Sequence, residues 1–207
     1  MINEKEFEEF LGINTIENES QEKDEKAKYS IYEATHYKGL IEIFKEVIMT
    51  PYDTLVDFGC GLGRVLFYCN QQYMCKVTGV EYDKDIYDKL QENAEDYCKR
   101  FKNQEKKMLF LNMKAEDYVI EPTDNYFYFF NPFSVEVMST VLDNILESVK
   151  KHPRKVTFIL YYCTYEIMGV IRKYPFTLEK IIKLPGYEED PDEKAYVYMC
   201  EYERGKG

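Results

Sequence analysis

Three glycines follow a short apolar run in the segment LVDFGCGLGR, residues 55–64. Glycine permits unusual backbone angles and lets a ligand approach the main chain closely. A loop of this composition after an apolar strand is typical of a site that cradles a nucleotide cofactor, because ligands of α/β sheets bind beyond the carboxyl ends of the strands. The alternative is a tight strand-to-helix turn without a ligand, but three glycines are more than such a turn needs.

The residues around the glycines indicate which cofactor the loop suits. The dinucleotide fingerprint G-x-G-x-x-G/A needs a final small residue where this chain has Arg64, and no G-x-x-x-x-G-K-[ST] phosphate loop is present. Asp57 lies just before the loop. A carboxylate there suits a cofactor with a cationic amino end and disfavours a pyrophosphate by like-charge repulsion.

A second acid lies at the end of the next apolar run, KVTGVE. This residue is Glu81, 18 residues beyond Gly63. An acid at that place accepts hydrogen bonds from the two hydroxyls of a ribose. NAD and S-adenosylmethionine both carry such a ribose, and the loop pattern with Asp57 favours S-adenosylmethionine.

The elements that must position these residues alternate between strand and helix patterns. We expect strands at 54–58, 76–81, 107–112, 125–131 and 155–162, helices at 31–48, 63–70, 83–101, 135–150 and 164–173, and a final hairpin of strands at 176–184 and 195–203. This order predicts an α/β fold: a doubly wound, seven-stranded sheet that is mostly parallel, with one antiparallel strand from the C-terminal hairpin and helices on both faces.

The composition of the 207 residues limits the classes of partner. The net charge of −11 repels polyanions, so nucleic acid is not expected as a partner. No apolar run is long enough to cross a membrane, and no signal-like segment opens the chain, so we expect a cytoplasmic protein. Six cysteines without C-x-x-C spacing and two histidines predict no metal site.

The first 28 residues differ from the remainder by their acidic, polar composition. We expect a short amphipathic helix near residues 3–11 and then a polar linker, with 1–28 as an N-terminal arm and 29–207 as one domain. The helix was interpreted as a solvated arm, and a lid over the site is the alternative.

The motifs VDFGCGLGR, GVEYD, AEDY and FFNPF together resemble those of class I S-adenosylmethionine-dependent methyltransferases, over roughly residues 30–203. More narrowly, the chain resembles small bacterial methyltransferases of unassigned substrate with a Y-E-A-T-x-Y lead-in. The resemblance implies a Rossmann-like fold and S-adenosylmethionine as the cofactor.

The resemblance also implies roles for individual residues. Asp57 lies near the amino group of the cofactor, Glu81 binds the ribose, and the hydroxyls of the lead-in close over the methionine carboxylate; a packed aromatic helix face is the alternative for the lead-in. The adenine is met by the backbone of Lys114 and Ala115 or by the carboxylate of Glu116 or Asp117. The full set of expected cofactor contacts is Tyr32, Thr35, Tyr37, Asp57, Gly59, Cys60, Gly61, Gly63, Glu81, Tyr82, Lys114, Ala115, Glu116 and Asn131.

The segment Asn131-Pro132-Phe133 resembles the [DNS]-P-P-[YFW] motif of amino-group methyltransferases, with one proline and Ser134 next. The resemblance implies that Asn131 orients the target nitrogen and that Phe133 offers an aromatic face. The alternative is a buried asparagine that ends a strand, with Tyr162 at the next strand end as the group that orients the acceptor.

The combined expectation is a methyltransferase that acts on a nitrogen, or an oxygen, of a protein or small molecule. A non-catalytic S-adenosylmethionine-binding module of the same fold is the first alternative. An NAD-dependent oxidoreductase is opposed by Arg64.

Overall fold

The computed structural model describes residues 3–16, 34–102, 104–130 and 133–202. Its centre is a seven-stranded sheet with the order β3-β2-β1-β4-β5-β7-β6. The strands are β1 (Thr54–Phe58), β2 (Lys76–Glu81), β3 (Met108–Asn112), β4 (Tyr126–Phe130), β5 (Lys155–Tyr161), β6 (Thr177–Lys183) and β7 (Lys194–Glu201). All neighbouring pairs from β3 to β5 are parallel, and β7 is antiparallel to both β5 and β6. The expected fold class is therefore confirmed, including the single antiparallel strand.

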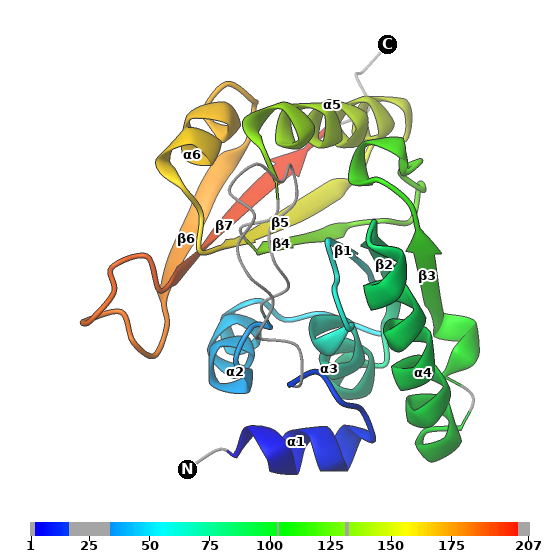
Figure 1. Ribbon diagram of the computed structural model, residues 1–207. Helices are drawn as coiled ribbons and strands as arrows, with labels where there is room; N and C mark the ends of the chain where they lie inside the picture. The colour runs from blue at the N-terminus through cyan, green and yellow to red at the C-terminus, as the bar shows by residue number, and fades with distance from the viewer. Residues whose placement is uncertain (1–2, 17–33, 103, 131–132, 203–207) are drawn as a thin grey trace.

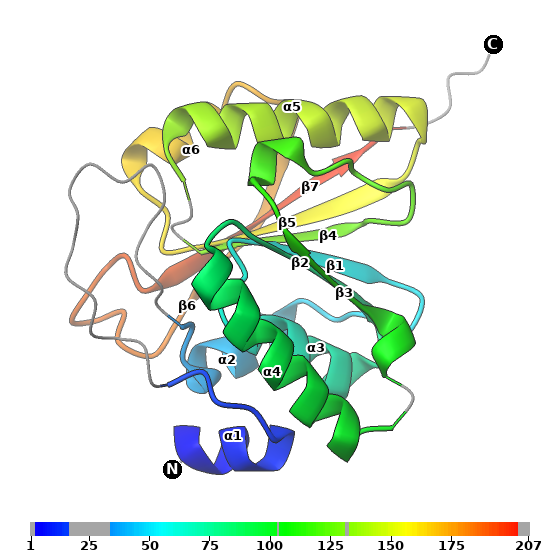
Figure 2. The ribbon, with the colours of Figure 1, turned by 45° about the vertical axis from the view of Figure 1, so that its right-hand side comes forward.

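Helices cover both faces of this sheet (Figures 1 and 2). One face carries α2 (Tyr37–Glu46), α3 (Arg64–Tyr73) and α4 (Lys84–Arg100), with α1 (Glu4–Leu11) packed below them. The other face carries α5 (Val135–Lys151), α6 (Tyr165–Ile171) and the 3-10 turn η2 (Ala115–Asp117). A second 3-10 turn, η1 (Glu105–Lys107), precedes β3. None of the helices in the described ranges is both long and apolar enough to cross a membrane.

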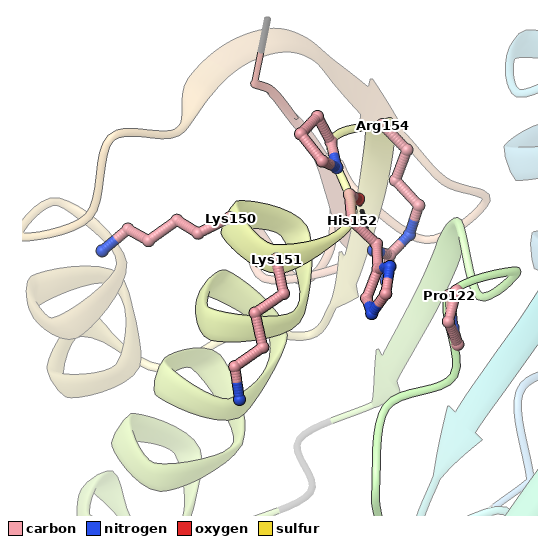
Figure 3. A pocket seen from close by; sticks show the side chains of 6 residues that line it. Pro122, Lys150, Lys151, His152 and Arg154 are labelled. Atoms are coloured by element: carbon pink, nitrogen blue, oxygen red, sulfur yellow. Dashed lines mark hydrogen bonds between the residues drawn. The ribbon is translucent and has the colours of Figure 1, made fainter. Parts of the chain in front are cut away.

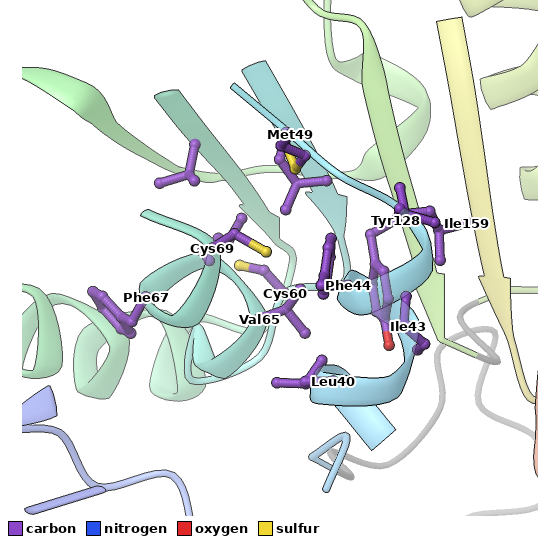
Figure 4. Close-up of a cluster of buried hydrophobic side chains, with 14 of the residues drawn as sticks. Leu40, Ile43, Phe44, Met49, Cys60, Val65, Phe67, Cys69, Tyr128 and Ile159 are labelled. Carbon is purple, nitrogen blue, oxygen red and sulfur yellow. The ribbon is translucent and has the colours of Figure 1, made fainter. Parts of the chain in front are cut away.

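Each face of the sheet has its own hydrophobic core. Figure 4 shows the first, where Leu40 and Phe44 of α2 meet Val65 of α3 and the sheet residues Tyr128 and Ile159. The second is built on aromatic rings that stack across neighbouring strands. Ring centroids lie 5.4 Å apart for Phe58 and Phe129 and 5.6 Å apart for Phe127 and Phe158. These fully buried strands explain the continuous apolar runs of the sequence.

The N-terminal helix differs from the solvated arm that we expected. Leu11 and Ile13 are buried in the first core, and Glu8 is only 4% exposed. The helix itself was predicted, and it ends at Gly12 in a left-handed conformation. Its amphipathic pattern contains enough apolar residues to dock it on α3. The boundary between residues 28 and 29 lies outside the described residues.

The helix expected at 31–48 begins later than predicted. It starts at Tyr37, and Ala34 to His36 before it are not helical. His36 is the N-cap residue and its side chain makes no capping hydrogen bond. Residues 34–36 of the lead-in are therefore a connecting segment and not part of a helix.

Candidate active site

The glycine loop lies at the carboxyl end of β1, between β2 and β4. Chain order reverses between β1 and β4, which makes this the switch point where ligands of such sheets bind. Gly59, Gly61 and Gly63 have φ angles of 75°, 54° and 87°, in the left-handed region. Side chains are disfavoured there, so all three glycines answer a backbone requirement.

The neighbouring strand β2 holds the loop through main-chain hydrogen bonds. The amides of Gly59 and Cys60 both donate to the carbonyl of Val80, at 2.8 and 3.2 Å. The amide of Gly63 donates to the carbonyl of Cys60 at 2.9 Å. The path of the loop is therefore fixed by the protein itself.

Glu81 has a role in the loop that the sequence did not suggest. Its Oε2 accepts from the amide of Gly61 at 2.9 Å, and its Oε1 accepts from the amide of Asp83 at 2.8 Å. Burial raises the pKa of this carboxyl, and the backbone donors oppose that shift. Glu81 thus braces the loop at the place where a ribose is expected.

Close packing explains why glycine is found at positions 63 and 79, and where the side chain of Cys60 lies. A Cβ atom on Gly63 would lie 2.6 Å from Cδ1 of Leu90, and one on Gly79 would lie 2.7 Å from Sγ of Cys60. The side chain of Cys60 therefore packs against β2, and burial raises the pKa of its thiol well above the ordinary value. The structure therefore gives two reasons for glycine at position 63, its left-handed φ angle and its close packing. The predicted contact of Gly63 with the cofactor stays a prediction.

Asp57 provides the test of whether this site fits the cofactor. The residue is 3% exposed, and no residue in the described ranges donates a hydrogen bond to its carboxylate. Desolvation, with a smaller contribution from the Glu81 charge, raises the pKa of Asp57 to about 8. A buried carboxyl without a donor is costly. The cationic amino end of S-adenosylmethionine would supply the missing partner, so the residues present fit this cofactor.

The lead-in approaches the same end of β1 through Thr35. Its hydroxyl lies 2.9 Å from that of Tyr128, whose position in β4 is paired with Asp57 in β1. The predicted contact of Tyr37 with the cofactor stays a prediction. Tyr37 is wholly buried, and its hydroxyl donates to Oε1 of Glu8 at 2.7 Å, so it packs α1 against α2. Tyr32 lies outside the described residues.

The predicted adenine side follows β3. Lys114 is the N-cap of η2, Ala115 is buried, and the carbonyl of Glu116 accepts from Asn144. Tyr82 is half exposed at the end of β2. These positions leave the adenine contacts as predictions.

A residue that the sequence reasoning missed fixes this side of the site. The Nδ2 of Asn112 donates to the carbonyls of Glu81 and Tyr82, at 3.0 and 2.9 Å. It thereby joins the carboxyl ends of β3 and β2. The signal available in the sequence was a lone amide residue at the end of an apolar strand.

The aromatic residue of the Asn131-Pro132-Phe133 motif lies beside the glycine loop. A Cβ atom built on Gly59 would lie 3.8 Å from Cε1 of Phe133, so the ring faces Gly59. Asn131 and Pro132 lie outside the described residues.

The end of β5 adds a second aromatic group on the acceptor side. Phe130 and Tyr161 stack with centroids 4.5 Å apart, and Tyr162 has a left-handed φ of 51°, which is uncommon for a residue other than glycine. The Tyr162 hydroxyl donates to Asp190 at 2.7 Å, and this bond raises the pKa of the phenol to about 12. The acidic connection between β6 and β7 is thus tied to the end of β5.

A basic hollow of about 370 Å³ lies elsewhere, at the opposite edge of the sheet (Figure 3). Lys150, His152 and Arg154 line it at the end of α5 and the start of β5. The Arg154 guanidinium donates to the carbonyls of Glu121, Asp124, Ser148 and His152. The Arg154 donors are thus occupied by main-chain carbonyls, which suits a structural role. The hollow is separate from the expected cofactor site.

Comparison with solved structures agrees with this fold. An RNA methyltransferase from Salinibacter ruber, in complex with S-adenosyl-L-homocysteine, matches with a TM-score of 0.54 and 13% identity, over 84% of this chain and 97% of that one. A SAM-dependent methyltransferase from Aquifex aeolicus matches with a TM-score of 0.53 and 14% identity, over 77% and 87% of the two chains. At such identities the likeness concerns the fold.

The sequence comparisons are more specific. A histone-lysine N-methyltransferase, H3 lysine-79 specific, from Dictyostelium discoideum is 47% identical over 53 residues, which are 26% of this chain and only 3% of that protein. The family described as histone methylation protein DOT1 matches residues 14–157, more than half of the chain. This range contains the glycine loop, Glu81, Asn112 and the Asn131-Pro132-Phe133 motif. The chain therefore belongs to the DOT1 family and is an S-adenosylmethionine-dependent methyltransferase.

Proposed function

We propose that this methyltransferase acts on a lysine amine of a protein. The observation that carries the proposal is that the ring of Phe133, the described part of the amino-group motif, faces Gly59 of the glycine loop, where we expect the methyl donor to bind. The Dictyostelium relative is a histone-lysine N-methyltransferase, which supports the same acceptor class. That match covers a small part of the relative, so the proposal concerns lysine as a class and no particular histone position.

The residues on the acceptor side suit an amine. S-adenosylmethionine, when bound, supplies an activated methyl group, so the protein's task is to orient the acceptor nitrogen for in-line attack. The Asn131 oxygen would accept an N–H bond of the amine and so direct its lone pair. The ring of Phe133 would lie against the aliphatic chain of the lysine, with a favourable contact for its cationic form.

The negative charge near the carboxyl end of β5 favours a basic protein as the methyl acceptor. The connection between β6 and β7 contains Glu188, Glu189, Asp190, Asp192 and Glu193, and the Tyr162 and Tyr161 hydroxyls hold Asp190 and Glu193 there. Acidic groups beside a site attract a cationic partner and raise its rate of encounter. A small anionic acceptor would be repelled by the same groups.

The test is a transfer assay with labelled methyl donor on a fractionated lysate and on purified lysine-rich proteins. The expected result is label in the protein fraction, stable in alkali, with methyl-lysine found by peptide mass spectrometry. Alkali-labile label would indicate a carboxyl oxygen as the acceptor. Label confined to small molecules or to RNA would contradict the proposal. Raising the salt concentration should slow transfer to a basic protein acceptor, since exposed charges are screened.

A further inference from the structure

The first residue of α3, Arg64, is a buried charge beside the glycine loop. It follows Gly63 directly and is only 4% exposed. Arginine is almost never buried unless its charge is paired. Its partners therefore show which parts of the chain the loop depends on.

Those partners come from two segments that lie earlier in the chain than β1. Nε of Arg64 donates to Oγ1 of Thr15 at 2.6 Å and lies 3.4 Å from Oε1 of Glu8. Nη1 donates to Oε2 of Glu4 at 2.9 Å and to the carbonyl of Thr35 at 3.2 Å. The guanidinium also lies over the ring of Tyr37, 4.8 Å from its centroid.

The partners are bonded to one another as well. Glu8 accepts from the Thr15 hydroxyl at 2.6 Å, the Thr15 amide at 2.5 Å and the Tyr37 hydroxyl at 2.7 Å. Glu4 accepts from the Tyr37 amide at 2.9 Å, at the first turn of α2. Each charge of this network is paired and each acid is hydrogen-bonded, which is the condition under which buried ionic groups are tolerated.

The network joins two walls of the cofactor site. One wall is the glycine loop, which ends at Arg64, and the other is the lead-in at Thr35, whose hydroxyl reaches Tyr128 next to Asp57 in the sheet. Neither Glu4 nor Glu8 belongs to these walls. Both lie on α1, which packs on the outer side of α3 (Figures 1 and 2).

We infer that α1 is part of the cofactor-binding apparatus: through Arg64, which acts as a positioning residue, its docking sets the spacing of the glycine loop and the lead-in and thereby the affinity for S-adenosylmethionine. The inference does not depend on the identity of the methyl acceptor. By linkage, the coupling must act in both directions, so cofactor binding also stabilises the docked α1.

The experiment measures the dissociation constant of S-adenosylhomocysteine by calorimetry, together with the melting temperature, in the full chain. Phe7→Ala removes the ring that stacks on Tyr37 at 4.6 Å and leaves the loop itself unchanged. We expect its affinity to fall by about tenfold, within the usual range of coupling between sites. Leu146→Ala is the matched control, because this half-buried side chain packs in the core on the opposite face of the sheet. It should lower the melting temperature and leave affinity within twofold.

Hydrogen exchange gives a readout that a purely structural helix would not move. Binding of S-adenosylhomocysteine should slow exchange of the amides in Glu4–Leu11, and Phe7→Ala should abolish this protection. Arg64→Lys keeps the positive charge but loses the planar guanidinium group. It should bind S-adenosylhomocysteine more tightly than Arg64→Met does. Unchanged affinity in Phe7→Ala, with no ligand-dependent protection of α1, would overturn the inference. If Arg64→Met does not fold, Phe7→Ala and the exchange data still decide.

Discussion

The carboxyl edge of the sheet has two halves that are built in different ways. The half that we propose binds the cofactor, the cofactor half, lies at the ends of β1 and β2 and is built from main-chain hydrogen bonds and three glycines with left-handed φ angles. The half that we propose binds the acceptor, the acceptor half, lies at the ends of β4 and β5 and is built from side chains: Phe133, the stacked pair Phe130 and Tyr161, and Tyr162, which is hydrogen-bonded to Asp190.

This difference explains how proteins of one fold can bind the same cofactor and differ in the acceptor that they methylate. The cofactor half is formed by the backbone, so its shape changes only when one of the three glycines is replaced. Their left-handed φ angles disfavour such replacements. A site made of side chains on three separate segments can change one residue at a time. The two halves should therefore respond differently to mutation.

The largest effect is expected at Gly61. Gly61→Val places a branched side chain at a φ of 54°, which costs about 1–3 kcal/mol, and disturbs the amide that donates to Glu81. Affinity for S-adenosylhomocysteine should fall by at least about 100-fold. Gly169→Ala is the control, because a Cβ there meets no atom within 4 Å and the residue lies in α6. Unchanged affinity in Gly61→Val would show that the loop is not the cofactor site.

The acceptor half should show the opposite pattern. Asn131→Ala should lower the methyl transfer rate by about two orders of magnitude, because it removes a contact that positions the reacting nitrogen. Calorimetry with S-adenosylmethionine should give an affinity within a few-fold of the parent protein. A wild-type transfer rate in Asn131→Ala would show that Asn131 does not orient the acceptor. Tyr162 would then be the next candidate for that role. A parallel loss of affinity would instead break the separation of the two halves.

Glu81 tests how far the cofactor half depends on one side chain. Glu81→Gln keeps the size of the residue but leaves one acceptor oxygen for the amides of Gly61 and Asp83, and a hydrogen bond to a charged group is worth about 1.5–3 kcal/mol. Affinity should fall by roughly ten- to hundredfold. Lys114→Ala should have a much smaller effect, since the backbone of Lys114 is the part expected to meet the adenine. A larger loss in Lys114→Ala than in Glu81→Gln would show that the adenine side is assigned incorrectly.

The smallest effect concerns the proton on Asp57. Its pKa of about 8 means that the carboxyl is largely protonated at neutral pH in the free protein. A cationic amino group favours the carboxylate, so binding should release close to one proton at pH 7. Calorimetry in two buffers with different ionisation enthalpies measures this release, and Asp57→Asn should abolish it. Proton uptake on binding would contradict the proposed pairing.

The same pKa predicts how stability depends on pH. The folded value exceeds the unfolded value near 3.9, so the folded protein holds a proton that the unfolded chain has lost. The contribution of Asp57 to the free energy of unfolding is therefore greatest below about pH 4 and is lost as pH rises to about 8. Denaturant unfolding of Asp57→Asn should show a shallower decline over this window.

The sequence predicted the strands of the cofactor half because their signals are local. The bounds of β1 and β2 were predicted to the residue, since each is a short apolar run with clear ends. Asp57, Glu81 and the glycines lie within or directly beside those runs, so their common location at the carboxyl edge follows from the parallel pairing of the two strands.

The sequence could not predict contacts between distant segments. Thr35 and Tyr128 are 93 residues apart, and Arg64 is 60 residues from Glu4. Arg64 was interpreted only as the residue that excludes a dinucleotide, because nothing near it indicates a buried ion pair. The hydrogen bond from the Tyr37 hydroxyl to Glu8 of α1 was not predicted either, because no local pattern specifies where α1 docks.

The strand order also has a consequence for the nascent chain. In the sheet, β6 pairs with β7 alone, and β7 pairs with β5. During synthesis, β6 leaves the ribosome before β7, so it has no partner and the outer edge of β5 stays uncovered until residues 194–201 emerge. An uncovered strand edge is a template for association with other chains. A chain that stalls in the acidic connection before β7 should therefore depend on chaperones, while one that passes it can close the sheet at once.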